Sequence, residues 1–217
     1  MAVTIDELFN EFDLDYEGPF KWYDNLNANY NGVYIIATTN KPKSKTPTNS
    51  FNICPKTFEF WIKEAEDLNI KGEKVKEITQ VSDYLENFWN PNENILYIGA
   101  SSSKTNPLQK RIQQFFDHKV GFQGPHTGGY WLKLLDCLEN TYVYYSKCKN
   151  PTQIEFKMLL KFVDKSSGNS FYDLEDFTNY FPFANLKIDV LKKHQIKNYT
   201  NKKKKSKKRK VTTVNRQ

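Results

Sequence analysis

The strongest constraint on the fold comes from two short segments whose residues favour β-strands and whose flanks favour turns. Residues 32–38 read GVYIIAT and residues 94–100 read NILYIGA. Both are rich in β-branched and aromatic residues, and both are bordered by Gly, Pro, Asn or Ser, which is typical of strands that end in loops. The sequence therefore predicts two strands that pair with each other. The long connection between them is tolerable because loop-closure entropy grows only with the logarithm of loop length.

The connection itself, residues 40–93, has apolar residues at helical spacing. FEFWIKEAEDL (58–68) and VSDYLENFW (81–89) show this spacing most clearly. We therefore expect a helical insertion between the first two strands.

Two further helices are predicted by a repeated opening. Asn106 and Asn150 are each followed at once by Pro and, two residues later, by Gln, which predicts an Asn N-cap, Pro at the first helical position and a capping box. The helices are expected to run to about His118 and about Asp164. GGYWLKLL (128–135) and NTYVYYSKC (140–148) favour two more strands between them. After Gly168 we expect a short helix, a turn containing Asn, and another helix.

This order of elements predicts an α/β or α+β domain with a small, mainly antiparallel central sheet flanked by helices. We place an N-terminal extension at residues 1–31, with a short helix from Ile5 to Phe12 and an irregular approach to the first strand. The domain is placed at 32–198 with the insertion at 40–93. A tail follows at 199–217.

The tail carries the excess positive charge. Residues 202–210 read KKKKSKKRK and hold eight of the 32 basic residues and no acidic ones, so the remainder has 24 basic against 25 acidic residues. The body must therefore bind a polyanion through local patches, and the tail is expected to be disordered. Non-specific nucleic-acid contacts, a solubilising terminus and a nuclear localisation signal are the alternatives for the tail. The basic residues are Lys202, Lys203, Lys204, Lys205, Lys207, Lys208, Arg209 and Lys210.

The sequence predicts neither a signal peptide nor a membrane span. Its first residues are acidic, and no run of about 18 apolar residues occurs. Three cysteines without a C-x-x-C pattern favour reduced thiols. We expect a cytoplasmic, nucleoid-associated protein, or a nuclear one if the host is a eukaryote.

Two charged residues lie where an apolar face is expected. Arg111 falls within the stripe of the first predicted helix, and only three of the 32 basic residues are arginines, the other two being in the tail. A guanidinium matches phosphate or carboxylate oxygens bidentately, whereas the alternative is a buried ion pair with a structural carboxylate. Glu155 lies at the edge of the buried face of the second helix. It is either a metal ligand or a carboxylate stabilised by the helix dipole.

Two tyrosines and two glycines mark the strands. Period-two alternation places Tyr34 on one face of the first strand, and Ile95, Tyr97 and Gly99 on one face of the second, so the two tyrosines can share a face when the strands pair. Core packing is the alternative for each tyrosine. Gly32 and Gly99 indicate either close backbone approach or a turn.

Together these residues resemble the GIY-YIG nuclease domain. Gly32-Val33-Tyr34 resembles its first half-motif, Tyr97-Ile98-Gly99 its second, Arg111 its helix arginine and Glu155 its metal-binding glutamate. The segment PFANL, with Asn185, resembles the asparagine segment that closes that domain. These elements occur in the family's order over about residues 30–190. The chain resembles a bacterial branch of the family that includes repair, homing and restriction nucleases.

The chain also departs from that family. The half-motifs are usually about ten residues apart, whereas 62 residues separate Tyr34 from Tyr97 here. Many members carry His or Tyr about one turn after the arginine, where this chain has Gln114 and Phe115. His118, two turns on, is a candidate substitute.

The resemblance implies hydrolysis of DNA phosphodiesters, double-stranded DNA being favoured, with one Mg²⁺ or Mn²⁺ held by Glu155. Arg111 would bind the scissile phosphate, and Tyr97, or else Tyr34, would take the proton of the attacking water. A phenol with a pKa of about 10 is a poor base at neutral pH unless a cation lowers that pKa, so Lys104 or Lys110 is a candidate helper. A homodimer is one option. The rival hypothesis is a catalytically inactive nucleic-acid-binding module with the same fold.

Overall fold

The structure is a computed structural model that describes residues 2–47, 50–65, 68–122, 129–188, 191–192, 196–197 and 199–200. Its helices are α1 (Ile5–Asn10), α2 (Pro55–Glu64), α3 (Ile78–Glu86), α4 (Leu108–Asp117), α5 (Gly129–Leu134) and α6 (Pro151–Ser167), with 3-10 turns η1 (Leu138–Asn140), η2 (Phe171–Asp173) and η3 (Thr178–Tyr180). Its strands are β1 (Glu17–Lys21), β2 (Gly32–Ala37), β3 (Asn69–Ile70), β4 (Glu73–Lys74), β5 (Ile95–Ser101), β6 (Gly121–Phe122), β7 (Tyr142–Lys147), β8 (Lys187–Ile188), β9 (Leu191–Lys192), β10 (Ile196–Lys197) and β11 (Tyr199–Thr200).

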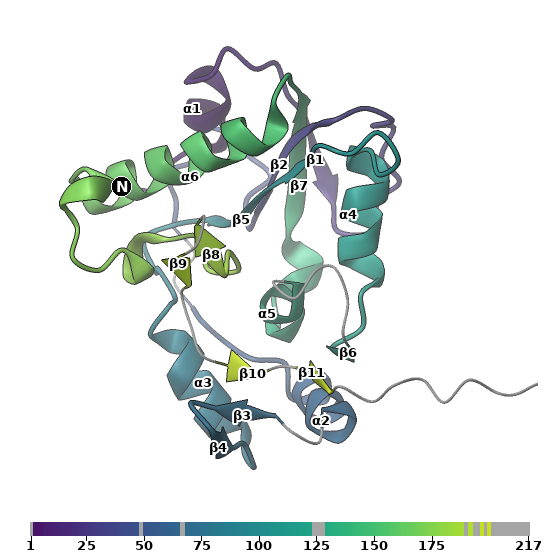
Figure 1. The fold of residues 1–217 in the computed structure, drawn as a ribbon, viewed down its shortest axis with the longest axis vertical. Helices are drawn as coiled ribbons and strands as arrows, with labels where there is room; N and C mark the ends of the chain where they lie inside the picture. The colour runs from purple at the N-terminus through teal and green to yellow at the C-terminus, as the bar shows by residue number, and fades with distance from the viewer. Residues whose placement is uncertain are drawn as a thin grey trace, which may run out of the picture.

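A four-stranded antiparallel sheet forms the centre of the molecule, and helices flank it, which confirms the expected α+β class (Figure 1). The strand order is β1-β7-β2-β5. The predicted pairing of residues 32–38 with 94–100 is confirmed, because β2 pairs with β5 along its whole length. Strand β2 also pairs with β7, and all six of its residues are buried. A strand buried on both faces has no alternation of polar and apolar residues, as GVYIIA shows.

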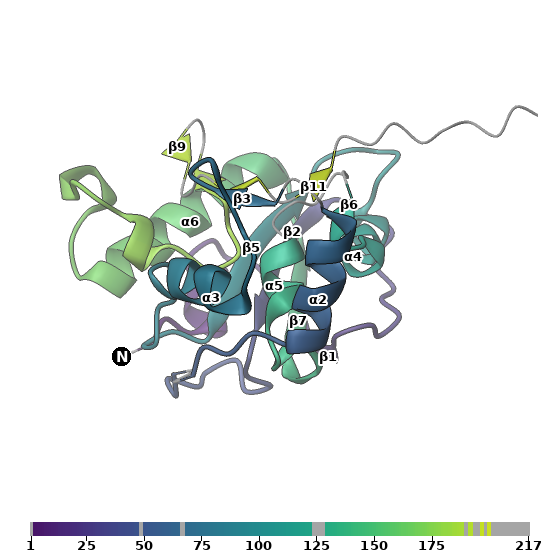
Figure 2. The same ribbon diagram turned by 90° about the horizontal axis from the view of Figure 1, so that it is seen from below.

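The two faces of the sheet carry separate apolar clusters. On one face, α1 and α6 pack against Val33 and Ile35 of β2. On the other face, α4 packs against Tyr34 and Ile36, and α2, α3 and α5 join the same cluster. Figures 1 and 2 show α6 and α4 on opposite sides of the central strands.

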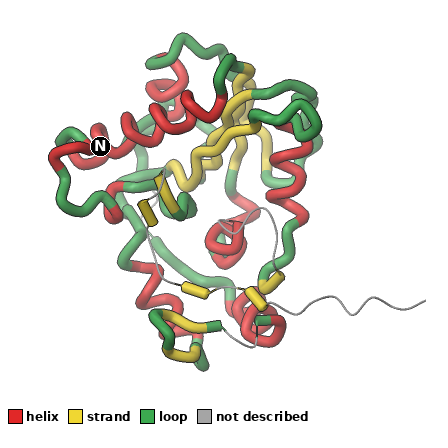
Figure 3. Tube along the Cα trace, viewed as in Figure 1, coloured by secondary structure: helices red, strands yellow, loops and turns green. Residues whose placement is uncertain are grey.

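The insertion contains both expected helices and a small hairpin. Helices α2 and α3 bury Phe58, Trp61, Val81 and Leu85, and strands β3 and β4 pair between them. Trp61 is completely buried. Figure 3 shows these elements below the central sheet. The insertion therefore extends the cluster on the α4 face.

The N-terminal residues, expected as an extension before the domain, are part of its core and its sheet. Helix α1 buries Ile5, Leu8 and Phe9, and a capping box between Thr4 and Glu7 begins it. The expected irregular approach contains β1, which pairs with β7 at the edge of the sheet.

The two predicted capping boxes are wrong, although α6 begins at Pro151 as expected. Helix α4 has Pro107 as its N-cap, and the Asn106 side chain donates to Gln114 Oε1 at 3.1 Å instead. Asn150 has a left-handed backbone with φ of 53° and no side-chain cap bond. A capping side chain normally reaches the first turn from an extended backbone, which Asn150 lacks.

The prediction of a strand at GGYWLKLL is also wrong, because Gly129–Leu134 form α5. Short apolar runs suit a strand or a buried helix equally well. Lys133, within this run, is buried and donates to the carbonyl oxygens of Phe116, at 2.8 Å, and His118 at the end of α4. Such a long-range contact has no signature in the local sequence.

The last predicted helix is also wrong, since β8 and β9 pair as antiparallel strands in that region. The turns η2 and η3 stand in place of the short helix expected after Gly168. The lysine-rich residues 202–210 lie outside the described residues. No helix in the described part of the chain is long and apolar enough to cross a membrane.

Candidate active site

Helices α4 and α6 both begin at the same end of the central sheet. Ser101, at the end of β5, and Lys147, at the end of β7, are both paired with Gly32 at the start of β2. Helix α4 follows β5, and α6 follows β7. Arg111 and Glu155 each lie within the first two turns of their helices. Figure 1 shows both helices beginning near the same end of the central strands, on opposite sides of them.

Tyr34 and Tyr97 share one face of the sheet, as the strand pattern predicts. Tyr34 is paired with Gly99, and Ile36 with Tyr97. The two tyrosine rings lie 5.7 Å apart between centroids, and Phe115 of α4 lies 5.0 Å from the Tyr97 ring. The prediction that Ile95 shares this face is wrong. A bulge next to Tyr97 turns the Ile95 side chain to the opposite cluster.

Gly99 is what allows the two tyrosine rings to meet. A Cβ atom at Gly99 would lie 2.5 Å from Tyr97 Cε1 and 2.7 Å from Tyr34 Cζ. No ordinary contact is that short. Of the two alternatives for Gly99, close approach is therefore the one that the structure supports.

Gly32, the first residue of β2, fulfils a similar requirement on the same face of the sheet. A Cβ atom there would overlap the carbonyl oxygen of Ser146 and lie 2.8 Å from Leu108 Cδ1. The backbone N–H of Leu108 also donates to the Tyr30 carbonyl at 2.8 Å. The glycine thus lets β7 and the start of α4 approach β2, which sets the position of Arg111.

Arg111 and Glu155 both act on the ionisation of the two tyrosines. Burial is the largest influence on each phenol, and it raises the pKa of Tyr97 to about 12 and the pKa of Tyr34 well above its usual value. Glu155 adds to both increases, because a nearby negative charge opposes formation of a phenolate, and Arg111 opposes them. The four residues singled out in the sequence are therefore electrostatic neighbours.

The centre of this group holds an unsatisfied polar atom. Tyr34 is completely buried, and its hydroxyl has no hydrogen bond of ordinary geometry within the described part of the chain. Arg111 is half-buried and forms no salt bridge with any described carboxylate. The interaction of the Tyr34 hydroxyl with Tyr97 makes the two hydroxyls neighbours, and a ligand or water oxygen could supply the hydrogen bond of ordinary geometry that Tyr34 lacks.

Glu155 is the carboxylate that could hold a divalent metal ion here. It is half-buried, and no cluster of three or more His, Cys, Asp or Glu side chains suited to a metal occurs among the described residues. Mg²⁺ commonly binds through one or two carboxylates and takes its other ligands from water and substrate phosphates. A single glutamate near the two phenols could serve as the one protein carboxylate of such a site.

Asn185 fastens the strand that carries the second tyrosine. Its buried side chain accepts from the Ile98 N–H at 2.9 Å and donates to the Ile98 carbonyl at 2.7 Å. The N–H of the preceding Ala184 donates to the Leu96 carbonyl at 2.8 Å. Because β5 is an edge strand, this segment pairs with backbone groups that would otherwise be open. Tyr97 and Gly99, which flank Ile98, are thereby held in place.

Three other candidate residues do not join this group. Lys104 is exposed in the loop between β5 and α4, and Lys110 donates to the Thr105 carbonyl at 3.1 Å. The cation that acts on Tyr97 is Arg111, not either lysine. His118 ends α4, about 10 Å along the helix from Arg111, where its Nε2 lies 3.0 Å from the Phe122 carbonyl oxygen. Burial, and secondarily Lys133, lower the pKa of His118.

Two side chains near Arg111 were missed as functional candidates by sequence reasoning. Gln114, one turn after Arg111, accepts from Asn106, and Phe115 packs on Tyr97. The helical spacing of Phe115 indicated a core position, but nothing in the sequence marks its contact with Tyr97.

No protein-family model, curated protein or solved structure matches this chain. What the four side chains can do therefore follows from their own chemistry and placement.

Proposed function

We propose that this protein is a divalent-metal-dependent DNA endonuclease with a GIY-YIG-type active site formed by Tyr34, Tyr97, Arg111 and Glu155. One observation carries the proposal: Arg111 and Glu155 each influence the ionisation of both tyrosines, whose rings lie 5.7 Å apart. A guanidinium, a carboxylate and two phenols that influence one another would provide phosphate binding, metal binding and proton transfer.

Arg111 would bind the scissile phosphate. Its planar guanidinium can donate two parallel hydrogen bonds to non-bridging oxygens and stabilise the charge that develops on them during attack. Among the described residues, no carboxylate forms a salt bridge with Arg111, which supports a role in binding an anionic ligand. Its half-buried position strengthens the interaction relative to one in bulk water.

Tyr97 would hold and accept the proton of the attacking water. It retains some exposure, whereas Tyr34 is completely buried, so Tyr97 is the phenol that water reaches more readily. Its pKa of about 12 keeps the hydroxyl protonated at neutral pH, and both the hydrogen bond from the Tyr34 hydroxyl and the charge of Arg111 favour its ionised form. A divalent ion bound at Glu155 would supply further positive charge beside the phenols and the phosphate.

Tyr34 would orient an oxygen atom of the phosphate or of the attacking water. Its buried hydroxyl neighbours the Tyr97 hydroxyl, forms no hydrogen bond of ordinary geometry among the described residues, and can donate to a phosphate or water oxygen that enters the site. The fixed hydroxyl would orient that oxygen at little entropic cost, because Gly99 and Tyr97 confine the ring.

Duplex DNA is the proposed substrate, and the lysine tail is proposed to add salt-sensitive phosphate contacts. A cytoplasmic, nucleoid-associated location would suit this activity, as would the nucleus in a eukaryotic host. Two copies would be needed for cutting both strands in one event, so a homodimer belongs to the same proposal.

A catalytically inactive nucleic-acid-binding module is the second candidate. It is favoured by the raised pKa of both tyrosines and by Gln114, which has no acid–base chemistry at the position where many GIY-YIG nucleases carry His or Tyr. In that case the same site would bind a phosphate without hydrolysing it.

Cleavage of supercoiled plasmid in Mg²⁺ or Mn²⁺ tests the proposal. The unmodified protein is expected to nick or cut the plasmid, and Glu155→Gln and Arg111→Lys are each expected to reduce the rate by about 100-fold or more. Glu59→Gln, the same change at an exposed position on α2, should leave the rate unchanged. DNA binding without cleavage in either metal would refute the enzyme and support the binding module.

A further inference from the structure

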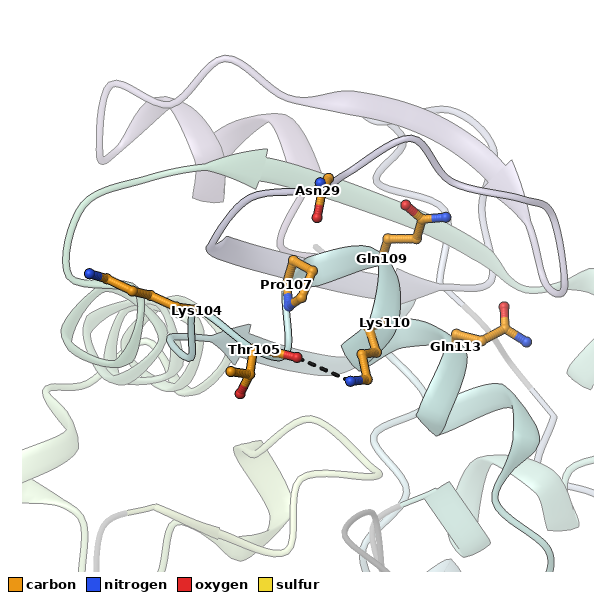
Figure 4. Close-up of a pocket in the computed structure, with 7 residues that line it drawn as sticks. All are labelled: Asn29, Lys104, Thr105, Pro107, Gln109, Lys110 and Gln113. Carbon is orange, nitrogen blue, oxygen red and sulfur yellow. Dashed lines mark hydrogen bonds between the residues drawn. The ribbon is translucent and has the colours of Figure 1, made fainter.

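A cleft on the outer side of α4 carries a second group of polar side chains beside the proposed active site. The cleft has a volume of about 470 Å³, and its polar lining residues are Asn29, Lys104, Thr105, Gln109, Lys110 and Gln113 (Figure 4). None of the described residues that line it is acidic. We call these six residues the α4 groove.

The α4 groove has the chemistry of a site for an anionic polymer with hydrogen-bonding groups. Lys104 and Lys110 supply two ammonium groups, and Asn29, Gln109 and Gln113 supply three side-chain amides. All five side chains are exposed. Lysines bind phosphates as point charges, whereas Asn and Gln amides can form paired hydrogen bonds with base edges, adenine above all.

Hydrogen bonds within the described protein occupy only some of the donors and acceptors of the α4 groove. Lys110 donates to the Thr105 carbonyl, which fixes its ammonium group over the loop, and Gln113 Nε2 donates to Asp117 at 2.9 Å. Among the described residues, the side-chain amides of Asn29 and Gln109 have no hydrogen-bond partner. Gln109 is nevertheless held in position, because its backbone N–H donates to the Ala28 carbonyl at 3.0 Å.

The position of the groove connects it with the site. Lys104 lies in the loop that joins β5, which carries Tyr97, to α4, and Lys110 is the residue before Arg111. A strand whose phosphate is held by Arg111 would thus pass two further ammonium groups. A volume of about 470 Å³ suits about one nucleotide unit beyond that phosphate.

We propose that the α4 groove binds the nucleotide next to the scissile phosphate, with Lys104 and Lys110 on its phosphates and Asn29 and Gln109 on its base. The proposal rests on the proposed nuclease function for the identity of the neighbouring phosphate. It adds that substrate selection involves a base contact outside the group of four catalytic residues.

The lysine part is tested by fluorescence anisotropy of a short labelled duplex with the full-length protein, in EDTA so that no cleavage occurs. Lys104→Ala/Lys110→Ala should weaken binding by about 10-fold or more at moderate salt and reduce the slope of log K against log salt by about two. Lys74→Ala/Lys76→Ala, which removes two exposed lysines from the insertion, should leave both quantities nearly unchanged. Equal losses in the two variants, or none in the first, would overturn the proposal.

The amide part is tested with Asn29→Ala/Gln109→Ala on two single strands of equal length, one with bases and one with abasic sites throughout. The variant should bind the base-containing strand about 5- to 10-fold more weakly and the abasic strand as tightly as the unmodified protein does. Equal effects on both strands would overturn base recognition. Poly-glutamate serves as a competing anionic ligand. If it bound as tightly as DNA and lost the same affinity in the lysine variant, the groove would be a site for acidic peptides, and the proposal would be overturned.

These measurements remain distinct from the test of catalysis. Failure of Glu155→Gln to change plasmid cutting would refute the proposed active site while leaving binding in EDTA unaffected. Unchanged binding in the groove variants, alongside normal metal-dependent cutting, would refute only the groove.

Discussion

At the scale of single residues, the site depends on the absence of a side chain at Gly99 as much as on the side chains of its neighbours. The missing side chain is the space in which the Tyr34 and Tyr97 rings meet. The strand pattern predicted that the two tyrosines share a face, whereas it left open whether Gly99 was a turn or a close approach.

Gly99→Ala is therefore expected to separate the tyrosine rings. The overlap should lower the free energy of unfolding by about 1–3 kcal/mol, measured by urea denaturation, because neither ring can move without displacing Phe115 or β5. Plasmid cutting should fall by more than this loss of stability explains.

Gly168→Ala is the control for that change. Gly168 has φ of 75°, and no atom lies within 4 Å of the position that an alanine methyl group would take there. Alanine at this position should therefore cost about 1 kcal/mol through backbone strain alone. Cutting by this variant should be normal. Normal cutting by Gly99→Ala as well would show that the ring contact has no part in function.

At the scale of secondary-structure elements, the site is built where two helices leave one end of a sheet. Strands β5 and β7 both end opposite Gly32, so the first turns of α4 and α6 bring Arg111 and Glu155 together although they are far apart in the sequence. Helical periodicity marked both residues as unusual on their own helices. It held no information on the distance between those helices.

The edge strand β5 provides the prediction at this scale. Asn185→Ala should lower the free energy of unfolding by about 2–4 kcal/mol, because it leaves the buried N–H and C=O of Ile98 without partners. Hydrogen exchange at the Ile98 amide should also become faster, and plasmid cutting should decrease, since Tyr97 and Gly99 lie on either side.

Asn92→Ala, at an exposed asparagine in the loop before β5, should change none of these quantities. If Asn185→Ala matched this control in stability, the side chain would not be what secures the edge of the sheet.

At the scale of the whole molecule, the N-terminal segment is tied to the body by a buried carboxylate. Glu93 is almost fully buried and accepts from the Val3 N–H at 2.8 Å. Burial raises the pKa of Glu93 to about 7, against the hydrogen bond from Val3, which lowers it. The folded protein therefore binds a proton at this group more tightly than the unfolded chain does.

The sign of the pH dependence follows from that difference. Between about pH 4.5 and pH 7 the folded state holds more protons at Glu93, so this group's contribution to stability is present at low pH and is lost as pH rises. The loss should amount to about 3 kcal/mol in urea unfolding. Glu93→Gln should abolish this contribution, and Glu59→Gln should retain it. An unchanged pH profile in Glu93→Gln would show that another group is responsible.

Local sequence was enough to predict the strands 32–38 and 94–100, their pairing and the shared face of the two tyrosines. It also predicted the two helices of the insertion, and it located the first residues of α4 and α6 to within one position. These features are recorded in local composition and in periods of two or 3.6 residues, which act over short distances along the chain. Arg111 and Glu155 were recognisable because a charge on an apolar face is unusual.

Contacts between distant segments decided the rest. Gly129–Leu134 form a helix in which Lys133 reaches the end of α4, and residues 17–21 form a strand that pairs with β7. The αL backbone of Asn150, the bulge beside Tyr97 and the cleft along α4 likewise arise in the folded chain. Local patterns fix what each segment can form, whereas burial and hydrogen bonding between segments select among those options. That selection brings one guanidinium and one carboxylate close enough to two phenols to act on their ionisation.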